Sequence, residues 1–318
     1  MGKALGEALA MEATLCAICD LDDAEPVAVG EDFEYRTSED EFLVVRCRRC
    51  SLVYLDRRPI AAELERIYPP SYHAFDFSPE RFGMGYRARQ AIERLRLRRI
   101  TKGLASSARI VAIGCGDGFH LDLLRSIQPA WELIGIEPDP RAADRARERG
   151  FEVLESRIED ASLAEDSVDL AITIQTIEHV ADPVRLAAAA GLALRPGGRL
   201  LVITDNTGSV DFTLFKGRHW GGYHFPRHWN LFDAASMKVL ASRAGLNPVQ
   251  MSTAVSPVNW TYSIRNLLDD WGAPPALVRS FALDRTAPLA AFTAFDLLHR
   301  AAGRGALLWA VLEKEQRR

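Results

Sequence analysis

Residues 110–121 read Ile-Val-Ala-Ile-Gly-Cys-Gly-Asp-Gly-Phe-His-Leu, an apolar run that passes through three closely spaced glycines into a helical pattern. Such a run is typical of a buried strand that leads into a tight turn and then a helix. Glycine has no Cβ and tolerates positive φ, so the turn can bring the backbone close to a ligand. We therefore expect ligand contacts at the turn residues Gly114, Cys115, Gly116, Asp117 and Gly118.

Strands and helices alternate after this turn. The pattern predicts helices at 119–126, 140–149, 183–193 and 234–244, and strands at 108–113, 132–137, 152–154, 167–174, 199–204, 248–255 and 306–312. Alternation at this spacing is typical of a parallel sheet with helices on both faces. The sequence therefore predicts an α/β fold with a doubly wound sheet.

Polar residues follow several of the predicted strands. Glu137 and Pro138 follow the second strand, Ile158 and Glu159 follow the third, and Gln175 follows the fourth. The carboxyl ends of parallel strands share one edge of a sheet, where open α/β folds bind ligands. An acidic side chain after the second strand can accept both hydroxyls of a ribose, and residues after the third can meet an adenine.

Together these motifs resemble the class I S-adenosylmethionine-dependent methyltransferases. The resemblance rests on residues 113–118, 136–138, the strand that holds Asp169, residues 177–183 and residues 194–198, and it covers roughly residues 105–255. It implies S-adenosyl-L-methionine as cofactor and a Rossmann-like methyltransferase fold, with a seven-stranded, mostly parallel sheet and an antiparallel last strand. The family often has an acidic residue two positions before the first glycine; here that residue is Ala112.

Four cysteines form two C-x-x-C pairs in the first 50 residues: Cys16, Cys19, Cys47 and Cys50. Each such turn presents two sulfurs on one side, and two turns provide the four ligands of a tetrahedral structural Zn²⁺. We therefore predict a small zinc-ribbon module over residues 1–58. Within it we expect a loosely helical tail at 1–14, an acidic, strand-poor loop between the pairs, and short strands at 41–46 and 51–54.

Residues 59–104 join this module to the predicted catalytic domain, residues 105–318. We expect a short helix at 60–67, an aromatic linker and a basic helix at 86–104. Residues 81–102 hold eight Lys/Arg and one Glu, whereas residues 1–80 hold eight Lys/Arg and 17 Asp/Glu. The acidic module disfavours a nucleic-acid partner, because phosphate contacts need Lys and Arg. The basic helix remains either a solvated face or a patch for phosphate or a membrane.

Residues 217–228 follow the fifth strand and combine three histidines, a tyrosine and two arginines with glycines and a proline. A hydroxyl acceptor needs a base, so we consider His179, Tyr223, His224 and His228, with His219 beside them, as catalytic candidates. The alternative is that the aromatic residues only pack this loop. Gln175, Glu178 and His179 also match the Glu-x-x-Glu-His metal motif of some O-methyltransferases, but Gln is a poor ligand for a hard cation. We therefore predict a supporting role for Glu178 and His179.

Residues 256–304 form a mostly helical insertion before the last strand. Long insertions are usually functional. Its apolar side chains could cap a cleft, form a homodimer face or contact a membrane surface.

The bacterial methyltransferases that this layout resembles include sugar-modifying enzymes. The functional prediction is S-adenosylmethionine-dependent methyl transfer to a small-molecule, sugar or lipid-linked acceptor, favouring O-methylation in natural-product or glycan biosynthesis. The alternatives are an RNA methyltransferase that docks RNA on its zinc ribbon and a non-catalytic cofactor-binding scaffold. A cytoplasmic location is expected, because no apolar run reaches the roughly 18 residues needed to span a bilayer and the N-terminus lacks a signal-peptide pattern.

Overall fold

The computed structural model describes residues 8–69 and 79–316. The predicted aromatic linker therefore falls largely outside the described residues, as does the first half of the predicted N-terminal tail. Within the described ranges, no helix is long and apolar enough to cross a membrane.

Seven strands form the central sheet in the order β12-β13-β10-β9-β6-β7-β8. Strands β6 to β10 run parallel, and the final strand β13 is antiparallel to both of its neighbours. This topology confirms the predicted seven-stranded, mostly parallel sheet. The strands span Arg109–Ile113 (β6), Glu132–Ile136 (β7), Glu152–Leu154 (β8), Val168–Ile174 (β9), Leu194–Asp205 (β10), Asn247–Ala254 (β12) and Leu307–Glu313 (β13).

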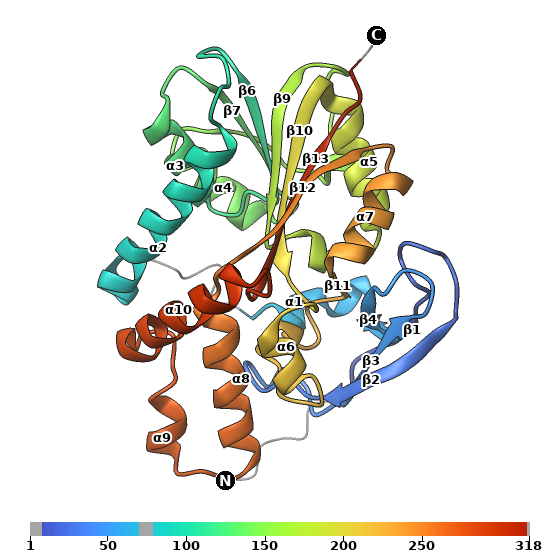
Figure 1. The fold of residues 1–318 in the computed structure, drawn as a ribbon, viewed down its shortest axis with the longest axis vertical. Helices are drawn as coiled ribbons and strands as arrows, with labels where there is room; N and C mark the ends of the chain where they lie inside the picture. The colour runs from blue at the N-terminus through green and yellow to red at the C-terminus, as the bar shows by residue number, and fades with distance from the viewer. Residues whose placement is uncertain (1–7, 70–78, 317–318) are drawn as a thin grey trace.

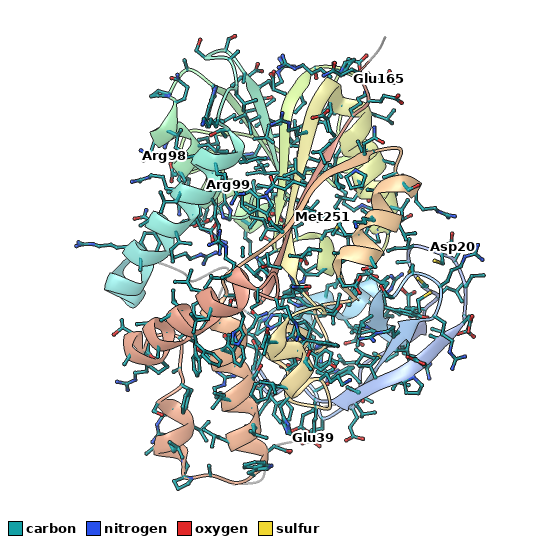
Figure 2. All side chains as sticks on the ribbon, in the orientation of Figure 1. Asp20, Glu39, Arg98, Arg99, Glu165 and Met251 are labelled. Carbon is teal, nitrogen blue, oxygen red and sulfur yellow. The ribbon has the colours of Figure 1, made fainter. Side chains whose placement is uncertain are left out.

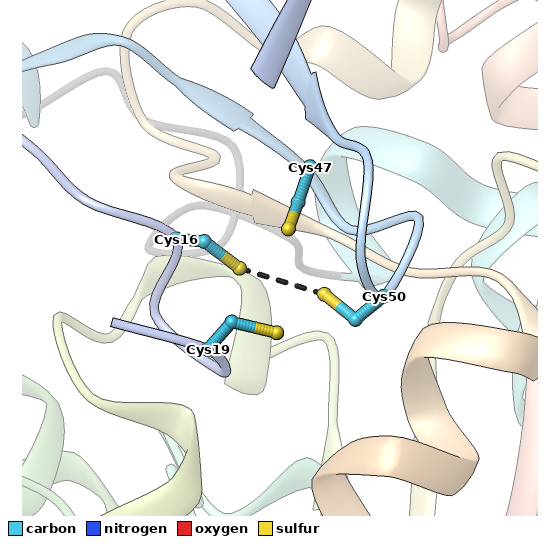
Figure 3. Close-up of side chains that lie close together, drawn as sticks. All are labelled: Cys16, Cys19, Cys47 and Cys50. Carbon is cyan, nitrogen blue, oxygen red and sulfur yellow. Dashed lines mark hydrogen bonds between the residues drawn. The ribbon is translucent and has the colours of Figure 1, made fainter. Parts of the chain in front are cut away.

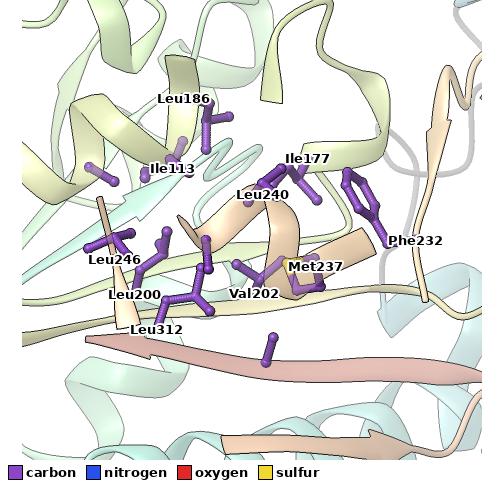
Figure 4. Close-up of a cluster of buried hydrophobic side chains, with 14 of the residues drawn as sticks. Ile113, Ile177, Leu186, Leu200, Val202, Phe232, Met237, Leu240, Leu246 and Leu312 are labelled. Carbon is purple, nitrogen blue, oxygen red and sulfur yellow. The ribbon is translucent and has the colours of Figure 1, made fainter. Parts of the chain in front are cut away.

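Helices cover both faces of this sheet (Figure 1). One face packs against α2 (Pro79–Ile100), α3 (Phe119–Ile127) and α4 (Pro140–Glu148), and the other against α5 (Pro183–Ala193) and α7 (Ala234–Arg243). Side chains alternate between the two faces along a strand. Ile110 therefore packs with the α3 side, whereas Val111 and Ile113 pack with the α5 side. Figure 4 shows that second cluster, in which Leu186 and Leu240 meet strand residues such as Val202.

The N-terminal region contains more strand than its sequence predicts. Strand β2 (Ala24–Gly30) occupies the expected strand-poor loop, and residues 11–13 form β1 rather than a helical tail. Strand β2 lies at the edge of a four-stranded sheet, and a register shift between Pro26 and Ala28 accommodates the proline. Proline is tolerated at such an edge, and partner strands supply the order that the local sequence lacks.

A segment from the far part of the chain completes this N-terminal sheet. Its order is β11-β4-β3-β2, where β3 is Phe42–Cys47, β4 is Val53–Leu55 and β11 is Asn230–Leu231. Strand β1 (Met11–Ala13) pairs separately with β5 (Arg57–Pro59). The sheet of the N-terminal module is therefore shared with the segment that follows residues 217–228, which we call the histidine loop.

Three helices fill the predicted insertion: α8 (Pro257–Asp270), α9 (Pro275–Arg279) and α10 (Thr286–Ala301). They extend away from the central sheet next to α6 (Val210–Phe215), as Figure 1 shows. A short helix, α1 (Leu64–Ile67), lies near 60–67 as expected, and the basic stretch forms α2. Arg98 and Arg99 of α2 are both exposed (Figure 2), and the Arg99 guanidinium lies 6.0 Å from the ring of Trp309 in β13.

Candidate functional site

The glycine turn connects β6 to α3 at the carboxyl edge of the sheet. Gly114, Gly116 and Gly118 all have positive φ, at 66°, 55° and 85°. A Cβ at Gly114 would collide with the Thr176 side chain, whereas a Cβ at Gly116 would have open space around it. The first glycine is thus needed for close packing, and the second leaves room for a ligand beside the backbone.

Glu137 follows β7 and faces this turn. Its carboxylate accepts one hydrogen bond from Gly116 N at 2.9 Å and another from Asp139 N at 3.0 Å. Burial raises the pKa of Glu137, and these two hydrogen bonds oppose that rise. Each oxygen still has acceptor capacity, which is what two ribose hydroxyls would use.

Two residues of the turn have partners inside the protein. Asp117 pairs with Arg149 at 2.5 Å and accepts from Phe119 N at 3.1 Å, which orders the start of α3. The Cys115 side chain is buried next to Gly135, and burial raises the pKa of its thiol to about 12. We therefore expect only the backbone at 115 and 117 to be available for a cofactor.

The other predicted cofactor residues lie after the carboxyl ends of neighbouring parallel strands. Pro138 is exposed after β7, Ile158 is buried and Glu159 half-buried in the turn after β8, and Gln175 follows β9 with a positive φ of 52°. The sheet topology thus brings all predicted cofactor positions to one edge.

Three predicted histidines meet beside that edge. The ring centroid of His228 lies 4.6 Å from that of His179 and 4.9 Å from that of His224. His179 belongs to a single helical turn after β9, and its Nδ1 lies 2.9 Å from the Tyr68 hydroxyl and 3.1 Å from Arg227 O. The three histidines therefore come from two segments, and Tyr68 adds a third segment that is distant from both in the sequence.

His228 has a buried carboxylate partner. Its Nδ1 lies 2.8 Å from Gly222 O and 3.2 Å from Oδ2 of Asp205, the last residue of β10. Both contacts are acceptors, so Nδ1 carries the proton and Nε2 is the basic nitrogen. Burial lowers the pKa of His228, but the hydrogen bond and charge of Asp205, with the charge of Glu178, raise it overall.

Glu178 is fully buried next to these histidines. Its Oε2 accepts from the Thr204 hydroxyl at 2.9 Å, and Oε1 has no hydrogen-bond partner among the described residues. Burial raises the pKa of Glu178 to about 7, and the charge of His228 opposes that rise. Glu178, His179 and His228 each place one ligand-type atom within 4.8 Å of the others. Gln175 leaves this group one carboxylate short of the Glu-x-x-Glu-His pattern.

Tyr223, His224 and His219 occupy different surroundings from His228. The Tyr223 hydroxyl donates to Lys216 O at 2.5 Å, and its ring packs among Trp220 and Phe225. His224 Nδ1 pairs with the buried Glu34 at 2.7 Å, and His219 pairs with Asp270 at 2.8 Å. The Tyr223 hydroxyl thus donates its proton inside the loop and the ring is buried among aromatic side chains, while its catalytic role stays a prediction.

The four paired cysteines come together in the N-terminal module (Figure 3). Their sulfurs all lie within 4.8 Å of one another, and those of Cys16 and Cys50 are 3.5 Å apart. Tetrahedral zinc with Zn–S bonds of about 2.3 Å separates its sulfurs by roughly 3.8 Å. Three of the four side chains are buried, so the donor set and spacing fit a structural zinc ion.

A model of the methyltransferase domain family matches residues 83–251, just over half of the chain. The chain belongs to this family. A ubiquinone biosynthesis O-methyltransferase from Cereibacter sphaeroides is 27% identical over 168 residues, which cover 49% of this chain and 67% of that relative. Together with the glycine turn and the sheet, this match identifies the protein as a class I S-adenosylmethionine-dependent methyltransferase.

Solved structures confirm the fold of the methyltransferase. An S-adenosylmethionine-dependent methyltransferase from Thermotoga maritima has a TM-score of 0.50 at 22% identity, covering 78% of this chain and 98% of its own. Phosphoethanolamine N-methyltransferase 2 from Haemonchus contortus has a TM-score of 0.53 at 15% identity, covering 92% and 69%. At these identities the likeness concerns the fold alone.

Two residues of the methyltransferase site, Asp205 and Tyr68, are not among those predicted from the sequence. Asp205 could have been predicted from its position, because an acidic residue at the carboxyl end of a buried parallel strand lies at the edge of the sheet where ligands bind. Tyr68 belongs to the aromatic linker, which was expected either to pack against the next domain or to line a ligand cleft, but only the tertiary structure shows its contact with His179.

Proposed function

We propose that this methyltransferase methylates an oxygen of a small-molecule acceptor, and that His228 takes the proton of the acceptor hydroxyl. The observation that carries the proposal is the buried pair of His228 and Asp205 at the carboxyl edge of the sheet. General bases in enzymes are commonly histidines held by a carboxylate on the opposite ring nitrogen.

The tautomer assigned to His228 supports this role. Nδ1 is committed to Gly222 O and Asp205, so Nε2 holds the lone pair that accepts a proton. Asp205 then stabilises the imidazolium that forms. Asn259 Nδ2 donates to the other oxygen of Asp205 at 2.6 Å, which holds the carboxylate in place.

S-adenosylmethionine, when bound, supplies a methyl group that is already activated as a sulfonium. The protein therefore contributes positioning, exclusion of water and proton removal. We propose that Glu137 binds the ribose hydroxyls of the cofactor. The glycines Gly114, Gly116 and Gly118 let the cofactor lie close to the backbone of the turn. We propose that Ile158 and Glu159 contact the adenine, and that Pro138 and Gln175 contact the cofactor at the same edge of the sheet.

We assign Glu178 and His179 to the support of His228 and not to a metal. In the group that the described residues form, Glu178 is the one carboxylate beside the two histidines, whereas a hard divalent cation prefers several oxygen ligands. The four cysteines Cys16, Cys19, Cys47 and Cys50 would hold a structural Zn²⁺, and residues 1–58, 59–104 and 105–318 remain the proposed domains.

The acceptor class follows from the relatives and the charge pattern. The similarity to a ubiquinone biosynthesis O-methyltransferase favours a hydroxyl on a small or lipid-linked molecule. Residues 1–80 carry a balance of −9, which opposes docking of RNA on the N-terminal module.

The test is transfer of radiolabelled methyl groups from S-adenosylmethionine to a panel of acceptors. The panel contains a polyprenylated catechol, a nucleotide-linked sugar and bulk transfer RNA, and chelator is added in a parallel series. Chelator-resistant labelling of the catechol or the sugar supports the proposal. Labelling of RNA alone, loss of labelling with chelator at intact N-terminal zinc, or tight cofactor binding without any transfer would each overturn it.

A further inference from the structure

We infer that Asp32 of the N-terminal module is a positioning residue for His228 and acts through Arg227. The inference rests on the proposed role of His228 in proton transfer. It adds that the N-terminal module forms part of the acceptor half of the site and is not a separate appendage.

Arg227, the residue before His228, is anchored inside the protein. Its guanidinium is fully buried and forms a two-pronged ion pair with Asp32, at 3.1 Å from Nη1 to Oδ1 and 3.0 Å from Nη2 to Oδ2. Nε donates to Ile67 O at 2.6 Å, and Nη1 also donates to Phe225 O at 2.6 Å. This fork geometry fixes the direction as well as the position of the side chain.

The module holds Asp32 rigidly in turn. Oδ1 accepts from Tyr35 N at 3.0 Å, and Oδ2 accepts from the backbone and hydroxyl of Thr37 at 2.9 and 2.7 Å. Burial would raise the pKa of Asp32, but the hydrogen bonds and charge of Arg227 lower it to about 2. The carboxylate therefore remains charged at neutral pH.

The residue after His228 is tied to the same module. Leu55 N of β4 donates to Trp229 O at 3.1 Å, and β11 then pairs with β4. Trp229 N donates to Glu178 O at 2.7 Å, which joins this strand to the turn after β9. The backbone on both sides of His228 thus depends on contacts that the N-terminal module makes.

A buried ion pair is a poor source of net stability, because desolvation of the two charges offsets their attraction. Its value here is geometric. The pair fixes the φ and ψ of the residue next to His228, and with them the direction in which Nε2 points. Loss of the pair should allow the His228 ring to change its orientation under conditions in which the N-terminal sheet is still folded.

The test uses the full chain labelled with ¹⁵N-histidine. Asp32→Asn alone leaves Arg227 buried without its counter-ion and can unfold the protein, so the main variant is Asp32→Asn with Arg227→Met. Arg227→Lys, which keeps the charge and loses the fork, is the milder variant. The control is Asp166→Asn with Lys314→Met, which makes the same kind of change at a half-buried 2.8 Å ion pair near the opposite edge of the sheet.

Three readouts are measured: the imidazole ¹⁵N signals of His228, hydrogen exchange of the Leu55 and Trp229 amides, and calorimetric affinity for S-adenosylhomocysteine. In the double variant we expect mixed tautomer signals for His228, exchange of those amides accelerated by about tenfold or more, and cofactor affinity within about twofold. Arg227→Lys should shift the same readouts by less, and the control should leave all three unchanged.

Native His228 signals in either Arg227 variant would overturn the inference, as would unchanged exchange at Trp229. A variant that lowers the melting temperature but keeps the native signals below it also counts against the inference. The outcome is separate from that of the proposed function, because the tautomer of His228 is read without any acceptor. If turnover survives replacement of His228, the proposed function is wrong. The His228 signals measured in the Arg227 and Asp32 variants, and the inference drawn from them, are not affected by that result.

Discussion

The glycine turn and the histidine loop lie at the same edge of the sheet but are built in opposite ways. The turn is local: Gly114, Gly116 and Glu137 lie within 24 residues of one another, and the backbone between β6 and β7 sets their geometry. The histidine loop is composite: His228 depends on Asp205 from β10 and on Asp32 and Leu55 from the N-terminal module.

This difference separates two tasks of a methyltransferase. A common cofactor can be bound by a local motif that recurs with the fold. An acceptor that differs between enzymes is handled by parts recruited from elsewhere in the chain. If this division is right, damage to one region should leave the other intact.

Removal of the cysteine ligands should give the largest effect. Cys47→Ser with Cys50→Ser should abolish the expected content of about one zinc per chain, because two sulfurs cannot close a tetrahedral site. Strands β3 and β4 flank these cysteines, so β11 should lose its partner. Metal analysis and hydrogen exchange should show zinc loss, rapid exchange at residues 227–231 and normal protection in β6 and β7.

Cys115→Ser is the matched control, since this cysteine lies outside the cluster. It should retain zinc. Full zinc content in the double variant would contradict the four-thiolate site. Collapse of the central sheet along with β11 would show that the two regions are not separable.

Replacement of His228 should have the next largest effect. General bases contribute roughly 10²–10⁴-fold to rate, so His228→Ala should lower turnover by about 10³-fold. Affinity for S-adenosylhomocysteine should stay the same, because the glycine turn is untouched. His219→Ala, a histidine of the same loop that pairs with Asp270, should keep most of the turnover. Equal losses in the two variants would remove His228 from its proposed role.

Asp205→Asn should change both the size and the pH dependence of turnover. His228 must be neutral to accept a proton, and its pKa is raised chiefly by Asp205 once the opposing effect of burial is overcome. Wild-type turnover should therefore fall on acidification from above pH 6.5, the ordinary value for histidine. In the variant this acid limb should move to lower pH, while the maximal rate drops by roughly 10²-fold, the lower end of what a positioned base contributes. A pH profile whose acid limb stays in place would argue against the pair.

The sequence predicted the sheet and the glycine turn because both depend on local patterns. Apolar runs, glycines and strand-end polar residues repeat at spacings that the fold dictates, whereas the antiparallel direction of the last strand was predicted from the resemblance to the methyltransferase family. The N-terminal module was predicted less well. Strand β2 exists because β3 pairs with it, and a window that contains Pro26 and Glu25 does not carry that information.

The structure of the histidine loop could be predicted only in part from the local sequence. Its composition indicated a functional segment, but not which side chains turn inward. Tyr223 and Arg227 looked equally suited to face a substrate, and both are buried by partners from elsewhere in the fold. Asp32 has no local signal at all, since its partner lies 195 residues away.

Glu137→Ala should produce the smallest effect and one confined to the cofactor. The carboxylate holds the turn through Gly116 N and is proposed to accept two ribose hydroxyls, so its loss should weaken S-adenosylmethionine binding by about tenfold, or roughly 1.4 kcal/mol. Glu132→Ala makes the same chemical change at the opposite end of β7, where the side chain is exposed, and should bind normally. In both variants the His228 imidazole signals should remain those of the wild type. Unchanged calorimetric affinity in Glu137→Ala would refute the ribose assignment, and altered His228 signals would show that the turn and the histidine loop are coupled after all.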